Sequence, residues 1–354
     1  MRRDTREAVA EALAAAFLSG PWHLRSLLAR GEVALEAGGE WLRAVAFDVM
    51  QRWKEPPLHD ARALTRFIVT RDAFLDAWSR REIPTKVAHH FPFHPEMRPA
   101  RWPVPTLHTP GDVAAWLELS AEELTWFADV AAAGRHRRRE VARHYTWEWV
   151  ARGERLPRLL EAPKQRLKGL QRRVLHEVLA KLPAHEAAHG FVAGRSAVTH
   201  ARLHTGRAVV ARFDLRHFFT SVATERAFGV LRALGYTHEV SAVLLGLCTT
   251  RTPPAVLKRA PVPDDANGEV LNQRFFMLRA LEAWHFPQGA PTSRAWANLC
   301  AWWLDARLAA YAKSNGLTYS RYADDLVFSG DALSMLQLST MVDTVARDEG
   351  FRVN

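Results

Sequence analysis

The chain has 354 residues, of which 48% are hydrophobic and 24% charged, so it is too apolar for a disordered protein and long enough for two or three domains. Its formal net charge of +10 favours a polyanionic partner. Two cysteines, Cys248 and Cys300, exclude a disulfide framework, and we expect buried thiols in a reducing compartment. The sequence contains no apolar signal core and no run of 18 apolar residues, so we expect a cytoplasmic protein without a membrane partner.

The amino-terminal part of the chain, up to Pro110, divides into helices and a proline-rich stretch. Apolar periodicity predicts helices over 7–18, 41–53 and 60–80, separated by Gly and Pro breakers. We therefore expect a helical amino-terminal extension over residues 1–83. Residues 84–110 contain seven prolines and predict a linker or an extended arm, because proline cannot continue a helix.

A basic segment follows two short predicted helices, 109–119 and 122–133, the second of which begins with a capping box at Ser120. Residues 135–173 contain 13 Arg or Lys and 4 Glu, which gives this segment a net charge of +9. Such a concentration is the footprint of a phosphate-contact surface, although a solvated helix face is its alternative.

Strands and helices alternate over the rest of the chain. Residues 145–150 and 158–160 predict a hairpin, and 164–182 predict a helix. Beyond them we expect a strand over 209–213, a helix over 224–234, a Pro- and Asp-rich inserted loop over 252–269 and a long buried helix over 292–312.

Two adjacent carboxylates stand between two strand-forming runs near residue 320. Residues 319–322 and 326–329 predict a tight hairpin with Asp324 and Asp325 at its tip. Taken alone, the pattern also fits a solvated turn, and Asp214, at the end of the strand 209–213, also fits a helix cap. If the two strands are neighbours in one sheet, three carboxylates meet, and their repulsion favours a divalent cation such as Mg²⁺.

Several motifs resemble those of reverse transcriptases and, within that superfamily, the bacterial retron enzymes. Residues 322–325 (Tyr-Ala-Asp-Asp) resemble the catalytic hairpin, residues 213–219 the other acidic motif, and residues 286–293 the Pro-Gln-Gly loop ahead of a palm helix. Residues 158–163 and 189–196 are similar to two further family blocks upstream.

The retron resemblance rests on Ala201 and His204 ahead of the catalytic strand and on residues 247–249 (Leu-Cys-Thr). The chain departs from the retron pattern at two positions. His200 stands where a conserved box of that family begins with Asn, and Arg294 stands where the Gln-Gly loop ends in Pro.

The resemblance implies an α+β fold, with the fingers and palm of a right-hand polymerase built from an antiparallel sheet and packed helices. The fingers would cover 111–207 with the basic RNA-binding segment, and the palm 208–354 with an inserted loop over 250–285. Residues 351–354 resemble the beginning of the next family block. We therefore expect the end of the palm and the thumb to be missing, and the chain to be a fragment, a processed product or half of a split enzyme.

The resemblance further implies a nucleotidyl-transfer site with two Mg²⁺ ions. Its catalytic and metal-binding residues would be Asp214, Asp324 and Asp325, together with the Leu215 carbonyl. Its nucleotide-binding residues would be Arg152, Arg158, Phe219, Gln288 and Gly289. Its RNA-binding residues would be Lys164, Lys168, Arg172, Arg173, His200 and His204.

Several of these roles have plain structural alternatives. Phe219 would press against the sugar where a 2′-hydroxyl would lie, but it also suits ordinary core packing. Arg152 and Arg158 also suit a solvated hairpin, and His200 and His204 also suit surface histidines whose hydrogen bonds are satisfied.

The implied activity is that of an RNA-directed DNA polymerase, which copies a cognate structured non-coding RNA into DNA from deoxynucleoside triphosphates. Priming would come from a 2′-hydroxyl of that RNA, and the resemblance implies a role in anti-phage defence alongside an effector protein. Two alternatives stay open: an intron-like or other bacterial reverse transcriptase, and a non-catalytic RNA-binding scaffold. The intact acids disfavour the scaffold, because buried carboxylates are costly without a cation.

Overall fold

The computed structural model describes residues 6–130, 144–153, 155–263 and 267–354. Its backbone divides into two compact units. The amino-terminal unit comprises residues 1–100, 106–112 and 234–240, and the second unit comprises residues 101–105, 113–233 and 241–354. None of the described helices is long and apolar enough to cross a membrane.

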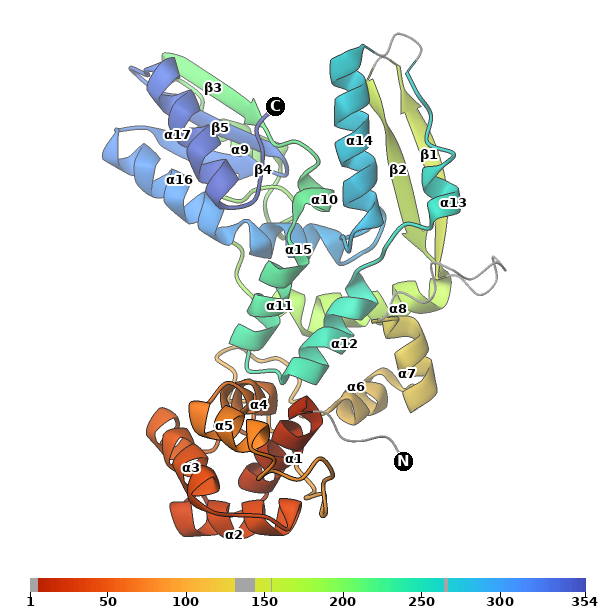
Figure 1. Ribbon diagram of the computed structural model, residues 1–354. Coiled ribbons are helices and arrows are strands. Elements are labelled where there is room, and N and C mark those ends of the chain that lie inside the picture. The colour runs from red at the N-terminus through yellow and green to blue at the C-terminus, as the bar shows by residue number, and fades with distance from the viewer. Residues whose placement is uncertain (1–5, 131–143, 154, 264–266) are drawn as a thin grey trace. The chain divides into compact units, whose positions relative to one another are not determined.

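The amino-terminal unit is a bundle of short helices (Figure 1). They are α1 (Arg6–Leu18), α2 (Leu24–Leu35), α3 (Glu40–Arg52), α4 (Ala61–Val69) and α5 (Asp72–Ser79). Fully buried Phe17, Leu42 and Phe74 lie in its core. Trp41 packs edge-on against Phe74 with ring centroids 6.3 Å apart, as expected of an aromatic core anchor.

The predicted helix over 60–80 is in fact two helices, α4 and α5. The Asp60 carboxylate caps α4 by accepting a hydrogen bond from the Ala63 N–H at 3.1 Å. Thr70 ends α4, and its hydroxyl donates to the Arg66 and Phe67 carbonyls, so the side chain takes acceptors that a continuing helix would use. Over residues 81–109 the structure contains neither helix nor strand, in agreement with the proline content.

The next elements are α6 (Pro110–Leu117), α7 (Ala121–Ala128), β1 (Tyr145–Arg152), β2 (Arg155–Pro163), α8 (Gln165–Glu177) and the 3₁₀ turn η3 (Leu179–Lys181). The predicted capping box of α7 is present, since Ser120 and Glu123 each accept from the other's backbone N–H. The predicted hairpin is present too: β1 and β2 pair antiparallel across a turn at Gly153, whose φ of +61° suits glycine.

The expected inserted loop over 250–285 differs most from the structure. It contains α13 (Pro254–Leu257) and α14 (Gly268–Glu282), which packs along β2 (Figure 1). Asn267 caps α14 by accepting from the Val270 N–H at 3.0 Å. The Pro- and Asp-rich composition ends just before this cap, so it marks the connection that leads into a helix rather than the whole insertion.

The remaining elements include three strands and seven helices. They are α9 (Ala197–Arg202), β3 (Val209–Asp214), α10 (Phe218–Ser221), α11 (Thr224–Ala233), α12 (His238–Cys248), α15 (Ser293–Cys300), α16 (Trp302–Ser314), β4 (Thr318–Tyr322), β5 (Asp325–Gly330) and α17 (Met335–Asp348). The three strands form an antiparallel sheet in the order β3-β5-β4.

The predicted helix over 292–312 is interrupted at Ala301, which separates α15 from α16. Arg226 Nη1 donates to the Cys300 carbonyl at 3.1 Å, so this oxygen bonds a side chain at the point where the helix axis changes. Cys300 and Cys248 are both free and buried, as expected.

The two faces of the β3-β5-β4 sheet differ in character. Side chains alternate along each strand, so one face carries Tyr319, Arg321 and Phe328, which pack toward α16. The other face carries Asp214 and Asp325. The sheet therefore has one core face and one face that presents acids.

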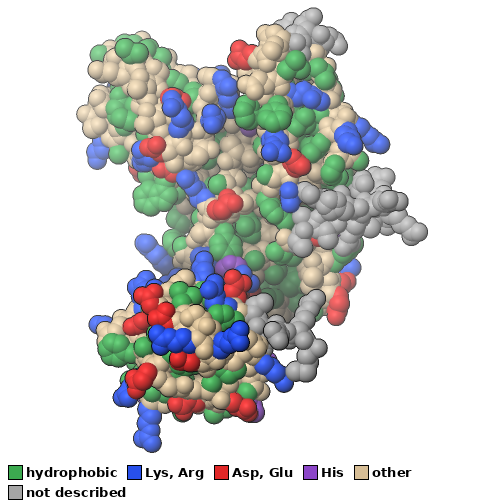
Figure 2. All heavy atoms as spheres, in the orientation of Figure 1, with side chains coloured by type: hydrophobic (Ala, Val, Ile, Leu, Met, Phe, Trp, Pro, Cys, Tyr) green, Lys and Arg blue, Asp and Glu red, His purple; other side chains and the backbone are tan. Residues whose placement is uncertain are grey.

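Charged side chains are exposed on both units. Figure 2 shows Asp and Glu interleaved with Lys and Arg over the amino-terminal unit, and Lys and Arg spread over the visible face of the second unit. Much of the predicted basic segment, residues 135–139 and 143, lies outside the described residues.

Candidate active site

The sheet brings the two acidic strand ends together. Asp214, the last residue of β3, pairs with Asp325, the first residue of β5. Directly paired residues of an antiparallel sheet point to the same face, so these two carboxylates share a face. Asp324 lies in the two-residue turn between β4 and β5, and its carbonyl accepts from the Leu215 N–H at 2.9 Å. This bond fastens the hairpin tip to the end of β3.

Mutual repulsion shows in the electrostatics of the tip. Burial is the main cause that raises the pKa of Asp324 above its ordinary value, and the charges of Asp214 and Asp325 raise it further. The Arg158 guanidinium acts in the opposite sense and lowers this pKa. The three acids therefore form one electrostatic cluster, and Arg158 of β2 lies within reach of it.

Two of the acids have a polar partner in the structure. Arg212, two residues before Asp214 on the same face, forms an ion pair with Asp325 through Nη2 and Oδ1 at 2.7 Å. Asn354 donates from Nδ2 to Asp214 Oδ2 at 2.5 Å and from its backbone N–H to the Asp214 carbonyl at 2.8 Å. The pKa of Arg212 is raised chiefly by its bond to Asp325, and the other two acids add to this effect.

The oxygen donors at the tip fit a hard divalent cation, although they do not form a closed cage. Within the described ranges, no three His, Cys, Asp or Glu side chains make up a preformed metal cluster. The donors that the sheet does supply are the Asp214 and Asp324 carboxylates and the Leu215 carbonyl. Leu215 also forms a β-bridge with Val353, and the two hydrogen bonds of this bridge run from the Asn354 N–H to the Asp214 carbonyl and from the Arg216 N–H to the Arg352 carbonyl. The bridge therefore does not use the Leu215 carbonyl.

The predicted nucleotide-binding arginines occupy different places on the β1-β2 hairpin. Arg158 is exposed, pairs with Val150 and acts on Asp324. Arg152 is exposed at the bulge beside the Gly153 turn, about 10 Å farther along the ladder at 3.3 Å per residue. Of the two arginines, Arg158 is the one whose charge lowers the pKa of Asp324.

The Gln288-Gly289 loop docks on β2. The Glu161 N–H donates to the Gln288 carbonyl at 2.9 Å. Gly289 has a φ of +138°, and a Cβ at this position would lie 2.9 Å from the Glu161 carbonyl oxygen, so both conformation and space call for glycine.

A buried hydrogen-bond network surrounds Glu161 of β2, next to that loop. The Glu161 carboxylate, fully buried, accepts from Trp147 Nε1 at 3.1 Å and from Thr252 Oγ1 at 2.8 Å, and contacts His285 Nε2 at 2.6 Å. Burial, the largest single effect, lowers the pKa of His285, but the Glu161 charge and the hydrogen bonds to Glu161 and the Ala283 carbonyl together raise it above its ordinary value. No motif in the sequence predicts this ion pair.

Phe219 lies five residues after Asp214, in α10. Its ring is half-buried, and the ring centroid lies 5.6 Å from that of the buried Phe218 and 5.9 Å from that of Phe191. The ring is therefore neither a free surface group nor part of the closed core, which suits a side chain that contacts a ligand.

The predicted RNA-binding residues of α8 differ in what they contact. Lys168 and Arg172 are exposed one turn apart, so they share a face of the helix. Arg173 instead pairs with Glu177 at 3.0 Å and with Glu118 at 3.1 Å, so its charge is already engaged. Lys164 is the half-buried N-cap residue of α8.

The predicted RNA-binding histidines belong to a row of rings beside the hairpin. Ring centroids of His189 and His200 are 5.7 Å apart, and those of His200 and His204 are 5.5 Å apart. His204 is buried, and its two ring nitrogens bond the hydroxyls of Ser329 at 2.8 Å and Ser320 at 2.7 Å. It has no nitrogen left for an RNA, so its place in the structure is a contact that supports β4 and β5. His200 is half-buried and packs against Tyr322 at 5.7 Å.

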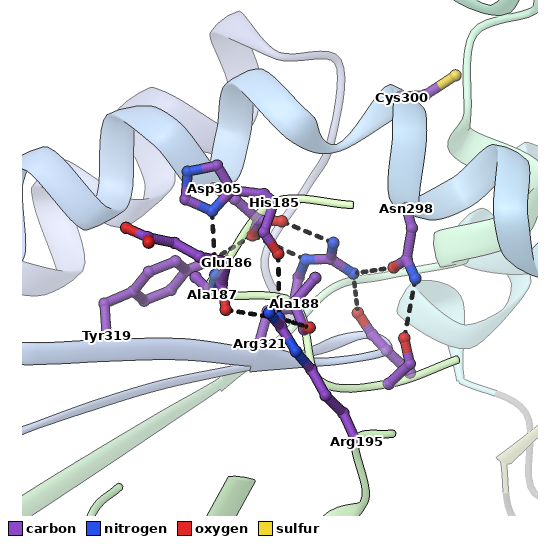
Figure 3. A network of polar contacts seen from close by, with 12 residues as sticks. His185, Glu186, Ala187, Ala188, Arg195, Asn298, Cys300, Asp305, Tyr319 and Arg321 are labelled. Carbon is purple, nitrogen blue, oxygen red and sulfur yellow. Dashed lines mark hydrogen bonds and ion pairs between the residues drawn. The ribbon is translucent and has the colours of Figure 1, made fainter. Parts of the chain in front are cut away.

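A fully buried network lies on the core side of the hairpin (Figure 3). Arg321 of β4 donates from Nε and Nη2 to the two carboxylate oxygens of Asp305 of α16, at 2.8 and 2.7 Å. Tyr319 Oη donates to the same carboxylate at 2.8 Å. Arg321 Nη1 reaches the Asn298 side chain at 3.0 Å and the Ala323 carbonyl at 2.9 Å, so the network ends at the turn that carries Asp324.

The same network fastens an upstream segment to the hairpin. The Arg321 N–H donates to the Ala187 carbonyl, and the His189 N–H donates to the Arg321 carbonyl, both at 2.7 Å. Arg195 Nη1 donates to the carbonyls of residues 185, 186 and 188 (Figure 3). The motif over 189–196 is visible in the sequence, but the pair of Arg321 and Asp305 is not, because two charges on different elements leave no periodic signal.

Together, these elements define a carboxylate-centred site that an arginine-bearing hairpin and a Gln-Gly loop flank. Residues 154–354, more than half of the chain, match the family described as reverse transcriptase (RNA-dependent DNA polymerase). The chain therefore belongs to the reverse transcriptase family.

Individual relatives place the chain close to retron proteins. It is 41% identical over 267 residues to the retron Mx65 reverse transcriptase of Myxococcus xanthus, which covers 73% of this chain and 56% of that protein. It is 40% identical over 254 residues to the retron Mx162 reverse transcriptase of the same organism, with 68% and 48% covered. It is 30% identical over 202 residues to the retron Ec86 reverse transcriptase of Escherichia coli, with 57% and 53% covered. The chain spans about half the length of these relatives.

Proposed function

We propose that the chain is a retron-type RNA-directed DNA polymerase that copies a structured RNA into DNA. The observation that carries this proposal is the junction of Asp214 with the Asp324-Asp325 turn, within reach of Arg158. The similarity to retron reverse transcriptases supports the retron type and an RNA template.

Two divalent cations, Mg²⁺ in our proposal, would activate the primer hydroxyl and stabilise the leaving pyrophosphate when bound. Asp214, Asp324 and the Leu215 carbonyl would hold them, and Asp325 would assist once it exchanges its ion pair with Arg212. Arg158 would bind triphosphate oxygens, since a guanidinium can contact two of them at once. Positioning and charge neutralisation would thus supply most of the acceleration.

The substrate would lie between three elements. Gln288 and Gly289, held on β2 through Glu161, would face the template–nucleotide pair, and Phe219 would contact the sugar. Lys168 and Arg172 would follow the RNA backbone as charges without base readout. Arg152 would contact an outer part of the nucleic acid rather than the triphosphate, because it stands about 10 Å farther along the hairpin than Arg158.

We also propose that the reaction takes place in the cytoplasm, with deoxynucleoside triphosphates as substrates, and that it serves anti-phage defence together with an effector protein. The two buried free thiols support a reducing compartment.

Mg²⁺-dependent primer extension on an RNA template tests the proposed chemistry. Asp324→Asn should lower nucleotide incorporation by about 10³-fold, because it removes the central anionic ligand. Asp331→Asn, at an exposed residue just after β5, is the matched control and should retain activity. Equal incorporation by wild type and Asp324→Asn would contradict the proposal.

A non-catalytic RNA-binding scaffold is the second candidate, and the ion pair of Arg212 with Asp325 favours it. The scaffold would bind structured RNA without Mg²⁺-dependent incorporation. Binding of both candidates to RNA should weaken by orders of magnitude between about 50 and 200 mM salt if six or more phosphates are contacted. Salt-independent binding would remove the phosphate-contact assignment of α8 from either candidate.

A further inference from the structure

A second aromatic ring lies against Phe219 in a segment that the proposed chemistry does not use. The Phe191 ring centroid is 5.9 Å from that of Phe219, and Arg294 Cζ lies 5.0 Å from the centroid of the Phe191 ring. The three side chains come from the loop before α9, from α10 and from the first turn of α15. Together they form a row of planar groups, called the stack below, in which the Phe191 and Phe219 rings are tilted by 41° and which ends at the proposed sugar contact.

The backbone before Phe191 is fixed against the turn that carries Asp324. A Cβ on Gly190 would lie 2.4 Å from the Ala323 nitrogen, so only glycine fits there. The Gly190 carbonyl accepts from Asn298 Nδ2 at 2.8 Å. The position of the Phe191 ring is therefore set by the same turn that carries the central acid.

Phe191 itself has a left-handed backbone. Its φ is +62°, a conformation that is unfavourable for a residue with a Cβ. Its side chain is 40% exposed, so burial of the ring in the core does not account for this conformation. Residues strained in this way persist where the surroundings fix them, and they concentrate at ligand contacts.

Arg294 supplies the other side of the stack. It is the second residue of α15, directly beyond the Gln288-Gly289 loop, and it replaces the Pro of the retron pattern. A guanidinium over an exposed aromatic ring is worth about 0.5–1 kcal/mol. The clamp on Phe191 is therefore a feature of this chain that proline could not provide.

We infer that Phe191, clamped by Arg294, is a positioning residue for Phe219 and sets how strongly the site rejects ribonucleotides. The inference rests on the proposed function, in which Phe219 contacts the sugar. A ring supported from behind cannot turn away from a 2′-hydroxyl, whereas an unsupported ring can. Selectivity between deoxyribose and ribose therefore depends on the whole stack and not on Phe219 alone.

The test measures the dissociation constants of dATP and ATP by calorimetry for the full chain bound to an RNA template and primer in Mg²⁺, and the incorporation of both nucleotides in primer extension. Arg294→Gln and Phe191→Leu should each lower the preference for dATP by about threefold or more, which is the factor that ~0.7 kcal/mol gives. In a Phe219→Ala background, neither change should lower it further, because the stack then has nothing to support. Arg101→Gln, which removes a similar contact 5.4 Å from the Trp102 ring, should leave the preference unchanged.

The outcomes separate the inference from the function on which it rests. If Arg294 were a triphosphate ligand, Arg294→Gln would weaken dATP and ATP equally, and an unchanged ratio would overturn the inference while the polymerase assignment stood. An equal loss of preference with and without Phe219 would also overturn it. Failure of the wild type to bind either nucleotide would overturn the proposed function and the inference with it.

Discussion

Two charged clusters lie within a few residues of one another on the β4-β5 hairpin, and they are built in opposite ways. The first cluster, called the base below, lies on the core side of the hairpin and consists of Arg321 and Asp305. These two side chains are fully buried and oppositely charged, and their hydrogen bonds are 2.8 and 2.7 Å long. At the tip, Asp214, Asp324 and Asp325 are half-buried and alike in charge. The base gains stability from its own partners, whereas the tip would gain it from the divalent cations that we propose to bind there. Like charges held together at some cost are typical of binding sites.

Removal of one partner at the base should have the largest effect on stability. Asp305→Ala leaves the Arg321 charge buried without its carboxylate, so we expect the free energy of unfolding to fall by about 3–5 kcal/mol. Denaturant titration measures this change, with Asp331→Ala as the exposed control. The double change Asp305→Leu with Arg321→Met should recover much of the loss, since no uncompensated charge remains. A loss below about 1 kcal/mol for Asp305→Ala would show that the base is not a stabilising pair.

The link between base and tip can be broken at Gly190. Gly190→Ala places a Cβ 2.4 Å from the Ala323 nitrogen, so the turn that carries Asp324 has to move. We expect nucleotide incorporation to fall by about 10²-fold, the usual consequence of a displacement of about 1 Å at a reacting centre. Gly169→Ala is the control, because a Cβ there meets nothing within 4 Å and the residue lies inside α8. Full activity of Gly190→Ala would disprove the link.

We expect the free energy of unfolding to depend on pH through His204, which bonds Ser320 and Ser329 of the sheet. Burial is the main cause that lowers the pKa of His204 from 6.5 to about 4, and the nearby charges of His200, His189 and Arg207 lower it further. The unfolded chain therefore binds this proton first as the pH falls, so stability is lost between pH 6.5 and about 4, on the order of 2 kcal/mol.

Unfolding free energies measured over this pH range check the His204 prediction. The dependence of the unfolding free energy on pH should weaken in His204→Asn. It should persist in His176→Gln, a change at an exposed histidine of α8. An unchanged slope in His204→Asn would assign the dependence to other groups.

The smallest expected effect is that of Asp324→Asn, at the tip, on the free energy of unfolding. Its sign distinguishes a binding site from a structural cluster. Since burial and neighbouring acids raise the pKa of Asp324, folding makes its ionised form less favourable than it is in the unfolded chain. Asp324→Asn should therefore keep or slightly raise the free energy of unfolding while it removes activity. Added Mg²⁺ should raise the melting temperature of the wild type more than that of the variant. A clear fall in the free energy of unfolding of Asp324→Asn would show that the tip, like the base, is a structural cluster.

Local sequence signals predicted the strands and the acidic ends well. The runs that flank Asp324 consist of strand-forming residues and the run before Asp214 is apolar, and the structure pairs the three strands in one sheet. Glycine positions such as Gly153 and Gly289 were also informative, because each has a positive φ.

Features set by distant contacts were not predictable in this way. The insertion over 250–285 contains α14, whose apolar residues Met277 and Leu281 pack on β2, and a composition rich in Pro just before it obscured this helix. The helix ends at Thr70 and Ala301 have no Gly or Pro breaker beside them, so the sequence pattern did not predict them. His204 looked like a surface residue because nothing in its neighbourhood along the chain indicates the two serines of β4 and β5 that enclose it.

The pairing of residues 187–189 with Arg321 also bears on how the protein reaches its native state. The acids of the turn are held by contacts whose partners lie far apart in the sequence, and such contacts form slowly, since the intervening chain has to be ordered first. Asp324 and Asp325 can therefore adopt their final arrangement only after the segment 185–191 has docked. During synthesis, the centre that we propose to be catalytic would be among the last parts of the second unit to assemble.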